Sequence, residues 1–340
     1  MTSTRWRIAW QTYAQGPAYP SPYRQFRTLA APEPGQAEAT SGLDLARLVA
    51  AELRETADAL DAAGRAAERI TLLDVGAADA GLLGNVAAVL GAQDPGLLAR
   101  TDFVAVDQRG PESGPSAGPS SVRWVVGDAT DPGTWREAFP GGLTGLIVAN
   151  EFLDDIPVEV AVRGDDAWRY VEVSESGLEQ TGEPVSESDS AWITRWWPGA
   201  RSEIGATRDA AARVLAEVLT AGRLTLIDYG HTLEERITGR WDAGTLVGYR
   251  AGAMVAPAPD GSMNLTAHVA VDAVAAGLVE YGSVRISRLA DEQSRPTVSA
   301  GSESAAGRLA GDAGTRLATR LSGRRAGRVA RRMFVIRLDR

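Results

Sequence analysis

The sequence contains no cysteine, no lysine and only two histidines, His231 and His268. Without cysteine, the chain can form no disulfide and offers neither a thiolate nucleophile nor cysteine ligands for a metal. Two histidines are too few for a typical zinc centre, so we expect no metal site. All 35 basic side chains are therefore arginines, a composition typical of proteins from GC-rich bacterial genomes.

Long apolar runs are also missing. No stretch is long enough to span a bilayer, and the N-terminus, with Arg5 and Arg7 among tryptophans, lacks the apolar region of a signal peptide. We therefore predict a cytoplasmic protein with no membrane partner. The formal net charge of −9 argues against nucleic acid as a partner, because such binding needs clustered cations. The arginine-rich run 320–332 is interpreted as a solvated helix face, with a basic patch as the alternative.

Short apolar segments alternate with helical patterns through the first half of the chain. The expected strands are 70–75, 103–107, 122–126 and 143–149, and the expected helices are 43–60 and 82–90. This alternation predicts an α/β fold in which a mainly parallel sheet has helices on both faces.

The second half interrupts this pattern twice. Residues 158–163 and 168–173 alternate in character around the turn Gly164-Asp165-Asp166 and predict a β-hairpin. The sheet resumes at 223–229, and an irregular Pro-rich segment follows. Further elements are expected as helices at 203–219, 270–280 and 302–328, and as strands at 283–289 and 333–338.

One domain with insertions fits this order better than two separate cores. We predict an N-terminal arm and helix at 1–60 and the main domain at 61–340. Insertions 155–222 and 230–282 would form the substrate side, since such long connections are seldom idle loops.

The first strand leads into LLDVGAADAGLLG, where Asp74 ends the strand and Gly76 opens a turn. Glycines at such a turn let backbone amides approach a nucleotide-type ligand. Ala78 and Ala80 occupy the positions where a full fingerprint has its second and third glycines. The turn is therefore a weak but well-placed signal for cofactor binding.

Two further acidic positions follow the next strands. Asp107 ends FVAVD, where a carboxylate could bind ribose hydroxyls, and Asp128-Ala129 follows the third strand and could line an adenine pocket. Each acid alone is about as easily a helix cap or loop residue. Acids at three successive strand ends favour a cofactor site.

The most informative segment is NEFLDDIP, residues 150–157, directly behind the apolar stretch 143–149. Ligands of open α/β sheets bind beyond the carboxyl ends of the strands. An amide and several carboxylates at this point are therefore placed for chemistry.

From this segment on, the chain resembles the MidA family of S-adenosylmethionine-dependent methyltransferases. The resemblance rests on NEFLDDIPVEVAV and WRYVEV, then LTLIDYG (224–230), GTLVGYR (244–250) and DGSMNLTAHV (260–269), with QFRT (25–28) in the N-terminal arm. It implies a class I methyltransferase fold: a Rossmann-like sheet of seven strands whose last strand, 333–338, is antiparallel. Mitochondrial members of that family methylate protein arginines in complex I assembly, so the resemblance implies S-adenosyl-L-methionine as cofactor and a protein arginine as acceptor.

The resemblance and the chemistry together assign site residues. Asn150 would face the cofactor, and Glu151 and Asp154 would grip the acceptor guanidinium. Asp228 and Tyr229 either contact the substrate or brace Asn150. The remaining candidates are His268 as a proton acceptor or a structural histidine, Tyr249 at the substrate, and Arg27 with Thr28 closing over the methionine end of the cofactor.

Competing functions remain open. A related enzyme could methylate a peptide or small natural product, for which a closed pocket is expected instead of an open groove. A non-catalytic assembly factor is a second alternative, motivated by Ala78 and Ala80 in the glycine turn. A nicotinamide-dependent oxidoreductase is disfavoured, because the turn lacks GxGxxG. The expected partner is a protein or peptide substrate, and a homodimer is compatible with the sequence.

Overall fold

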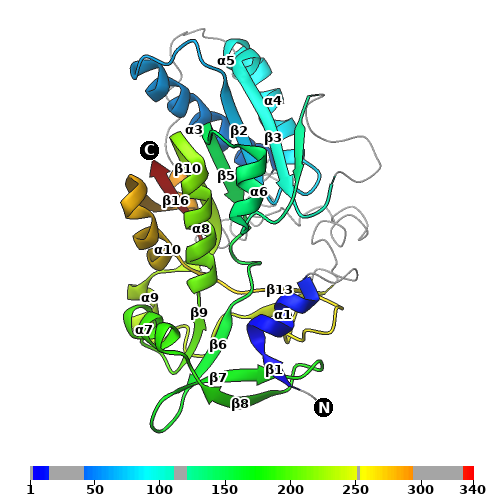
Figure 1. Cartoon of the computed structure of the whole chain (residues 1–340), viewed down its shortest axis with the longest axis vertical. Coiled ribbons are helices and arrows are strands. Elements are labelled where there is room, and N and C mark those ends of the chain that lie inside the picture. The colour runs from blue at the N-terminus through cyan, green and yellow to red at the C-terminus, as the bar shows by residue number, and fades with distance from the viewer. Residues whose placement is uncertain (1–2, 15–41, 111–120, 251–252, 294–331) are drawn as a thin grey trace, which may run out of the picture.

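The computed structural model describes residues 3–14, 42–110, 121–250, 253–293 and 332–340. Its central feature is a mixed sheet of eight strands (Figure 1). The strands are β2 Ile70–Val75, β3 Thr101–Asp107, β4 Arg123–Val126, β5 Leu143–Asn150, β10 Leu219–His231, β14 Val269–Ala270, β15 Ser283–Arg288 and β16 Met333–Asp339. The expected helix 302–328 and the QFRT motif lie outside the described residues.

Seven of these strands follow the order β15-β16-β10-β5-β2-β3-β4. The pairs from β4 across to β10 are parallel, whereas β16 runs antiparallel to both β10 and β15. The eighth strand, β14, pairs only with the end of β10, Gly230 opposite Val269. The sheet is thus one strand larger than the resemblance implied, because the chain returns alongside β10 after the second insertion.

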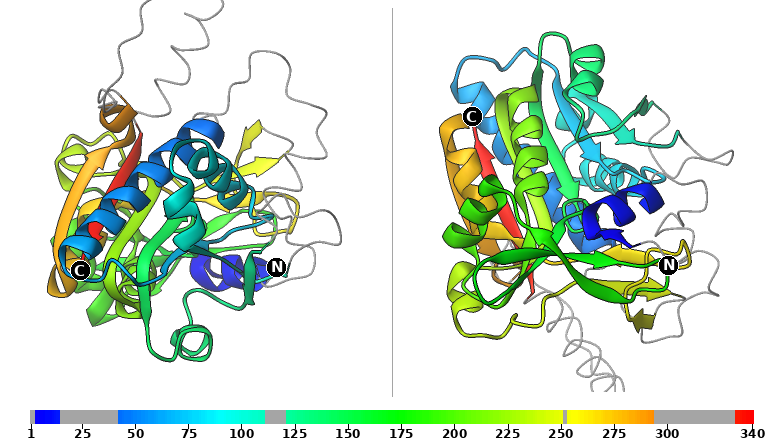
Figure 2. Two further views of the ribbon diagram at one scale, coloured as in Figure 1. Left: turned by 90° about the horizontal axis from the view of Figure 1, so that it is seen from above. Right: turned by 60° about the horizontal axis from the view of Figure 1, so that its bottom comes forward.

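Helices cover both faces of the sheet, as Figure 2 shows. One face packs against α3 Gly42–Ala62, α4 Gly81–Gln93 and α5 Pro95–Arg100; the other packs against α6 Pro132–Ala138, α8 Ala206–Val218 and α10 Val271–Leu278. Strand β2 contributes side chains to the apolar cores on both faces of the sheet. Leu72 packs in the core with α3 and α4, and Leu73 packs in the core on the opposite face. Side chains that alternate between two apolar layers explain the continuous apolar runs in the sequence.

A second sheet is built from the first insertion and the N-terminal segment. Its strands are β1 Thr4–Arg5, β6 Glu159–Arg163, β7 Trp168–Val173, β8 Glu179–Pro184 and β9 Arg201–Ile204. They follow the order β1-β7-β6-β9, with β8 paired to β7. The hairpin expected from the sequence is present as β6 and β7.

This smaller sheet is covered by helices α1 Trp6–Ala14 and α7 Glu187–Trp196. Helix α1 is not among the helices expected from the sequence. Trp6, Trp10 and Tyr13 lie on one side of that helix, and all three are buried. Glu203 also departs from expectation, since it pairs with Val160 in β9 and helix α8 begins only at Ala206.

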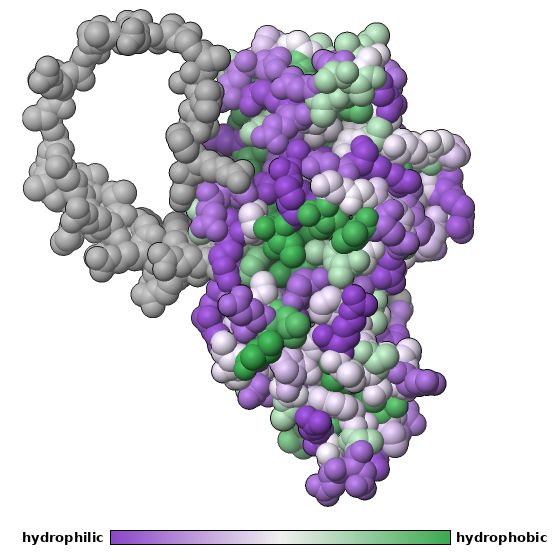
Figure 3. Space-filling model, turned by 90° about the vertical axis from the view of Figure 1, so that its left-hand side faces the viewer, coloured by the Kyte–Doolittle hydropathy of each residue, from purple (hydrophilic) through white to green (hydrophobic). Residues whose placement is uncertain are grey.

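The second insertion contains α9 Leu233–Ile237 and a three-stranded sheet in the order β12-β11-β13. These strands are Ala253–Val255, Val247–Arg250 and Asn264–Thr266, respectively. The 3-10 helix η1 Val279–Tyr281 and helix α11 Leu289–Gln293 flank the edge strand β15. On the face seen in Figure 3, apolar side chains gather in a central band between hydrophilic ones. Among the described helices, none combines the length and apolar character needed to cross a bilayer.

Candidate active site

The turn after β2 keeps the backbone of a glycine turn although it has lost two glycines. Gly76 has φ 73°, Ala78 has φ 49° and Ala80 has φ 59°. The left-handed region costs a residue with a Cβ about 1–2 kcal/mol. Ala78 and Ala80 adopt this left-handed conformation. The turn therefore has the shape of a ligand-binding turn, but its alanines lower the stability of the fold.

A small cavity of about 70 Å³ lies beside this turn. It is lined by Leu45, Asp74, Gly76, Ala77, Asp79, Gly81, Leu82 and Asn150. Three of the predicted cofactor residues, Asp74, Gly76 and Asn150, therefore meet at the carboxyl ends of β2 and β5. Burial, with the charges of Asp107 and Asp79, raises the pKa of Asp74 to about 8, so this carboxyl is poised to ionise when a cation binds.

Four other predicted cofactor residues do not line this cavity: Ala78, Asp107, Asp128 and Ala129. Asp107, at the end of β3, accepts a hydrogen bond from the Ala78 amide at 3.0 Å. Asp128 accepts one from the Thr130 amide at 2.8 Å, and the Ala129 carbonyl accepts one from Trp135 Nε1 at 2.9 Å. Arg27 and Thr28 lie outside the described residues.

The turn after β5 is tied to the end of β10. Glu151 takes a left-handed backbone with φ 49°, and its amide donates to the Ile227 carbonyl at 2.8 Å. The buried carboxylate of Asp228 accepts hydrogen bonds from the amides of Leu153 and Asp154, at 2.8 and 3.3 Å. Asp228 thus braces the turn that carries the acids.

Asp154 lies under this turn and is itself buried. Its Oδ2 accepts a hydrogen bond from the Thr266 hydroxyl at 2.8 Å, while Oδ1 has no hydrogen-bond partner among the described residues. Burial raises the pKa of Asp154. Burial, followed by the charge of Asp154, also raises the pKa of Asp228 well above its usual range. The two carboxyls therefore compete for negative charge.

Arg208, which is not among the residues predicted for the site, holds the surrounding loops together. Its buried guanidinium donates to the carbonyls of Asp154, Ile156, Ala267 and His268 at 2.7–3.1 Å. The Ile156 carbonyl belongs to the first insertion, whereas the Ala267 and His268 carbonyls belong to the second. A single arginine in an otherwise ordinary amphipathic helix gives no sequence signal for such a role.

Aromatic side chains complete this edge of the sheet. Tyr229 stacks on His268 with ring centroids 6.1 Å apart. Burial, with the charges of Glu151 and Asp154, raises the pKa of Tyr229; the same two charges act on Tyr249, after burial, in the same direction. Glu151, Asp154, Asp228, Tyr229, Tyr249 and His268 therefore form one acidic and aromatic cluster, which we call the acceptor edge.

His268 lies within this cluster in an environment that keeps its ring neutral. Burial and nearby arginine charges lower its pKa to about 4, and its ring also packs on Trp241 at 5.2 Å. A neutral imidazole with this pKa is a weak proton acceptor. Its assignment as a base remains a prediction that this environment does not favour.

Residues 48–284 match the family model described as "Putative S-adenosyl-L-methionine-dependent methyltransferase". The match spans well over half of the 340 residues, so the chain belongs to this family. The enzyme is thus a methyltransferase with S-adenosyl-L-methionine as its cofactor. A comparison with curated protein sequences finds no match.

Two solved structures share the fold over nearly the whole chain. One is a COG1565 superfamily member from Burkholderia thailandensis bound to S-adenosyl-homocysteine, with a TM-score of 0.68 and 17% identity, covering 99% of this chain and 88% of that one. The other is a COG1565 superfamily protein from the same organism, with a TM-score of 0.64 and 17% identity, covering 99% and 87%. At this identity the likeness shows an α/β methyltransferase-like fold.

The residues beside the β2 turn fit such a cofactor. The positive φ of Gly76 and Ala78 shapes a turn that a ligand can approach, and Asp74, Asp79 and Asn150 give the adjoining cavity a polar lining. A carboxyl whose pKa is raised to about 8 gains most from a positively charged ligand. S-adenosyl-L-methionine carries both an ammonium and a sulfonium.

Proposed function

We propose that this enzyme transfers the methyl group to a guanidinium nitrogen of an arginine side chain in a protein. The observation that carries the proposal is the acceptor edge, where Glu151, Asp154 and Asp228 place three carboxyls beside Tyr229 and Tyr249. An acidic, aromatic site suits a planar cation. The motifs that resemble the MidA family support the same acceptor.

A guanidinium remains protonated in proteins, so its nitrogens are poor nucleophiles. Bound cofactor supplies an electrophilic methyl group on a sulfonium. Glu151 would grip the acceptor and draw positive charge toward the nitrogens it contacts, which leaves the remaining nitrogen richer in electrons. The new N–C bond would form as the methyl–sulfur bond breaks, its electron pair going to sulfur. The guanidinium, now carrying one positive charge too many, would then release a proton from a nitrogen that Glu151 contacts, and Glu151 would accept it.

The other acids have supporting parts in this proposal. Asp228 holds the turn through its two backbone hydrogen bonds, and the buried carboxyl of Asp154 would lie beneath the acceptor. Asn150 separates the acceptor edge from the cavity that it lines with Asp74 and Gly76. Asp107 and Asp128 would bind the ribose and adenine of the cofactor, and Arg27 with Thr28 would close over its methionine end.

A protein acceptor is favoured over a small natural product by exposure. Tyr249 is 38% exposed and Glu151 is also exposed, so within the part of the chain that the structure describes this end of the acceptor edge opens to solvent. An extended polypeptide could present an arginine there. A small molecule bound there would leave these side chains exposed to water, and it would bury less of its own surface.

The test is incubation with methyl-labelled S-adenosyl-L-methionine and bacterial lysate, followed by separation of proteins from small molecules. We expect label in protein and, after hydrolysis, in methylarginine. Label found only in small molecules would favour the natural-product alternative. Failure to bind the cofactor at millimolar concentration would favour the assembly-factor alternative.

A further inference from the structure

A second cavity, of about 300 Å³, lies in the smaller sheet and is distinct from the acceptor edge. It is lined by Arg5, Arg7, Glu159, Tyr170, Ser186, Asp189, Ile204, Ala206 and Thr207. None of these residues belongs to the acceptor edge or to the cavity beside the β2 turn. Its volume is at the lower end for ligand cavities, which hold roughly 300–1,000 Å³.

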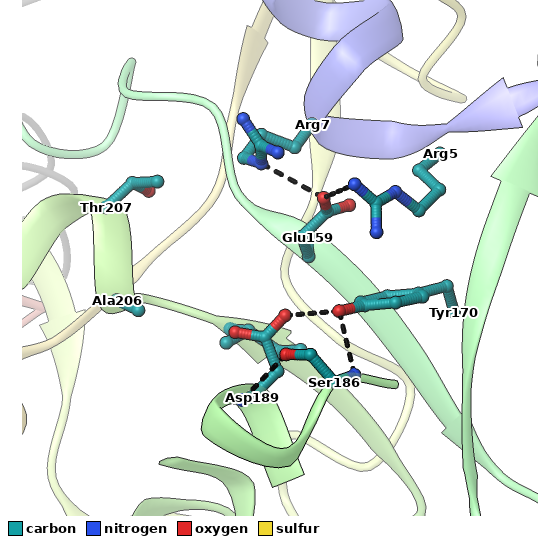
Figure 4. A pocket seen from close by; sticks show the side chains of 9 residues that line it. Arg5, Arg7, Glu159, Tyr170, Ser186, Asp189, Ala206 and Thr207 are labelled. Atoms are coloured by element: carbon teal, nitrogen blue, oxygen red, sulfur yellow. Dashed lines mark hydrogen bonds and ion pairs between the residues drawn. The ribbon is translucent and has the colours of Figure 1, made fainter. Parts of the chain in front are cut away.

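Two arginines converge on one oxygen of a buried carboxylate in this cavity. Arg7 Nε donates to Glu159 Oε1 at 3.0 Å, and Arg5 lies 3.4 Å from the same oxygen (Figure 4). The other oxygen, Oε2, is buried and has no hydrogen-bond partner among the described residues. Because Glu159 is only 5% exposed, an unpaired acceptor at this depth is costly unless a ligand or water supplies a donor.

Arg7 also has guanidinium nitrogens that do not contact Glu159. Arg7 uses only its Nε in the contact with Glu159, and its side chain is 32% exposed. The planar fork of a guanidinium fits a carboxylate through two parallel hydrogen bonds. This end of the cavity therefore offers an anion site beside an unpaired anionic oxygen.

A second carboxylate stands across the cavity. Asp189 accepts a hydrogen bond from the Tyr170 hydroxyl at 2.5 Å, and that hydroxyl accepts one from the Ser186 amide at 3.1 Å. Figure 4 shows Tyr170, Ser186 and Asp189 together below the arginine pair. These bonds fix the Asp189 carboxylate in place, so the cavity holds two positive and two negative side chains in a rigid arrangement.

We propose that this cavity binds a free α-amino acid. The ligand carboxylate would pair with the Arg7 fork, and its ammonium would donate to Glu159 Oε2 and Asp189. Ile204 and Ala206 would receive a small side chain. A simple anion would leave Glu159 Oε2 without a donor, and a simple cation would make no use of the outer nitrogens of Arg7, so a zwitterion matches both ends of the cavity.

The test is saturation-transfer NMR and isothermal titration of the full chain with glycine, L-alanine, L-serine and L-valine. Propionate and propylamine, each carrying only one of the two charges, serve as matched probes. We expect binding of at least one amino acid and none of the single-charge probes. Arg7→Gln and Asp189→Asn should each weaken binding by about tenfold, since each removes a charge-assisted contact.

Arg169→Gln is the matched control. Arg169 lies on the same sheet but donates to the Gly182 carbonyl and does not line the cavity, so affinity should be unchanged. Thermal unfolding of each variant checks that it folds. The proposal is overturned if no amino acid binds at about 10 mM, a concentration at which even a site with a millimolar Kd would be mostly occupied, or if both cavity variants bind normally.

Loss of amino-acid binding in Asp74→Asn would also overturn it, because the ligand would then occupy the cofactor site. None of these measurements requires turnover. The amino-acid site and the proposed arginine methylation can therefore fail separately.

Discussion

Asp228 accepts a hydrogen bond from the backbone amide of Leu153 at 2.8 Å, which ties the end of β10 to the turn after β5. The same carboxylate also accepts from the Asp154 amide. The residues that the sequence suggests as catalytic therefore divide into one that positions the turn and others that are proposed to face the acceptor. This division can be tested by mutation.

Asp228→Ala should cost about 2–4 kcal/mol of unfolding free energy, because two buried amides lose their acceptor. Asp228→Asn keeps one acceptor oxygen and should lose less stability and less activity. Chemical denaturation with a parallel transfer assay measures both. A stable Asp228→Ala variant without activity would instead place Asp228 in contact with the acceptor.

Glu151→Gln should reduce methyl transfer by at least about a hundredfold, the range for loss of a positioned acid or base. Affinity for S-adenosyl-L-methionine should stay near the wild-type value, because Glu151 does not line the cofactor cavity. Single-turnover kinetics and isothermal titration check the two expectations. Glu175→Gln, at another exposed glutamate, is the control and should be fully active.

Glu151→Gly separates backbone from side chain at the same position. Since Glu151 has φ 49°, glycine should relieve strain and raise stability by about 0.5–1 kcal/mol. Activity should still be lost. An active Glu151→Gly enzyme would contradict a role for the carboxylate.

The pH dependence of cofactor binding should report on Asp74. Burial raises the pKa of this carboxyl to about 8, so it is mostly protonated at neutral pH in the free enzyme. A cationic ligand favours the ionised form, and affinity should rise as the pH increases from 6 to 8. Titrations across this range should show the rise in the wild type and a flat profile in Asp74→Asn.

The Asp74 carboxyl should also make the free energy of unfolding depend on pH, in the opposite direction to the cofactor affinity. A folded-state pKa above the ordinary aspartate value means that the folded chain holds its proton more tightly than the unfolded chain. The contribution of Asp74 to the free energy of unfolding is fully present below about pH 4 and declines as the pH rises through about 8. Unfolding of Asp74→Asn should lack this decline, and an identical pH profile in both proteins would contradict the assignment.

The sequence could predict the main sheet because its strands are buried on both faces and read as apolar runs. It could not predict the limits of β10, expected at 223–229 but observed as Leu219–His231, since its extra pairing depends on β5 and β14. Helix α1 was missed because its apolar face consists of Trp6, Trp10 and Tyr13 within only nine residues. Its burial depends on strands far along the chain.

For the site, too, contacts between distant parts of the chain could not be predicted from the local sequence. Acids at strand ends could be recognised from local sequence, and six of the predicted residues meet at the acceptor edge. The bracing role of Asp228 depends on the register that sets Ile227 opposite Asn150. Arg208 depends on loops some 50 residues away in both directions. Neither relationship has a local pattern.

Ala78→Gly tests whether the altered glycine turn is strained. At φ 49°, removal of the Cβ should recover about 1–2 kcal/mol, offset by about 0.4–1 kcal/mol of added freedom in the unfolded chain. A net gain of about 0.5–1 kcal/mol in unfolding free energy is expected. Ala77→Gly is the matched control, because Ala77 is buried without a positive φ and should only lose stability. If Ala78→Gly is also destabilising, the turn is not strained at this position and Ala78 carries no cost in stability.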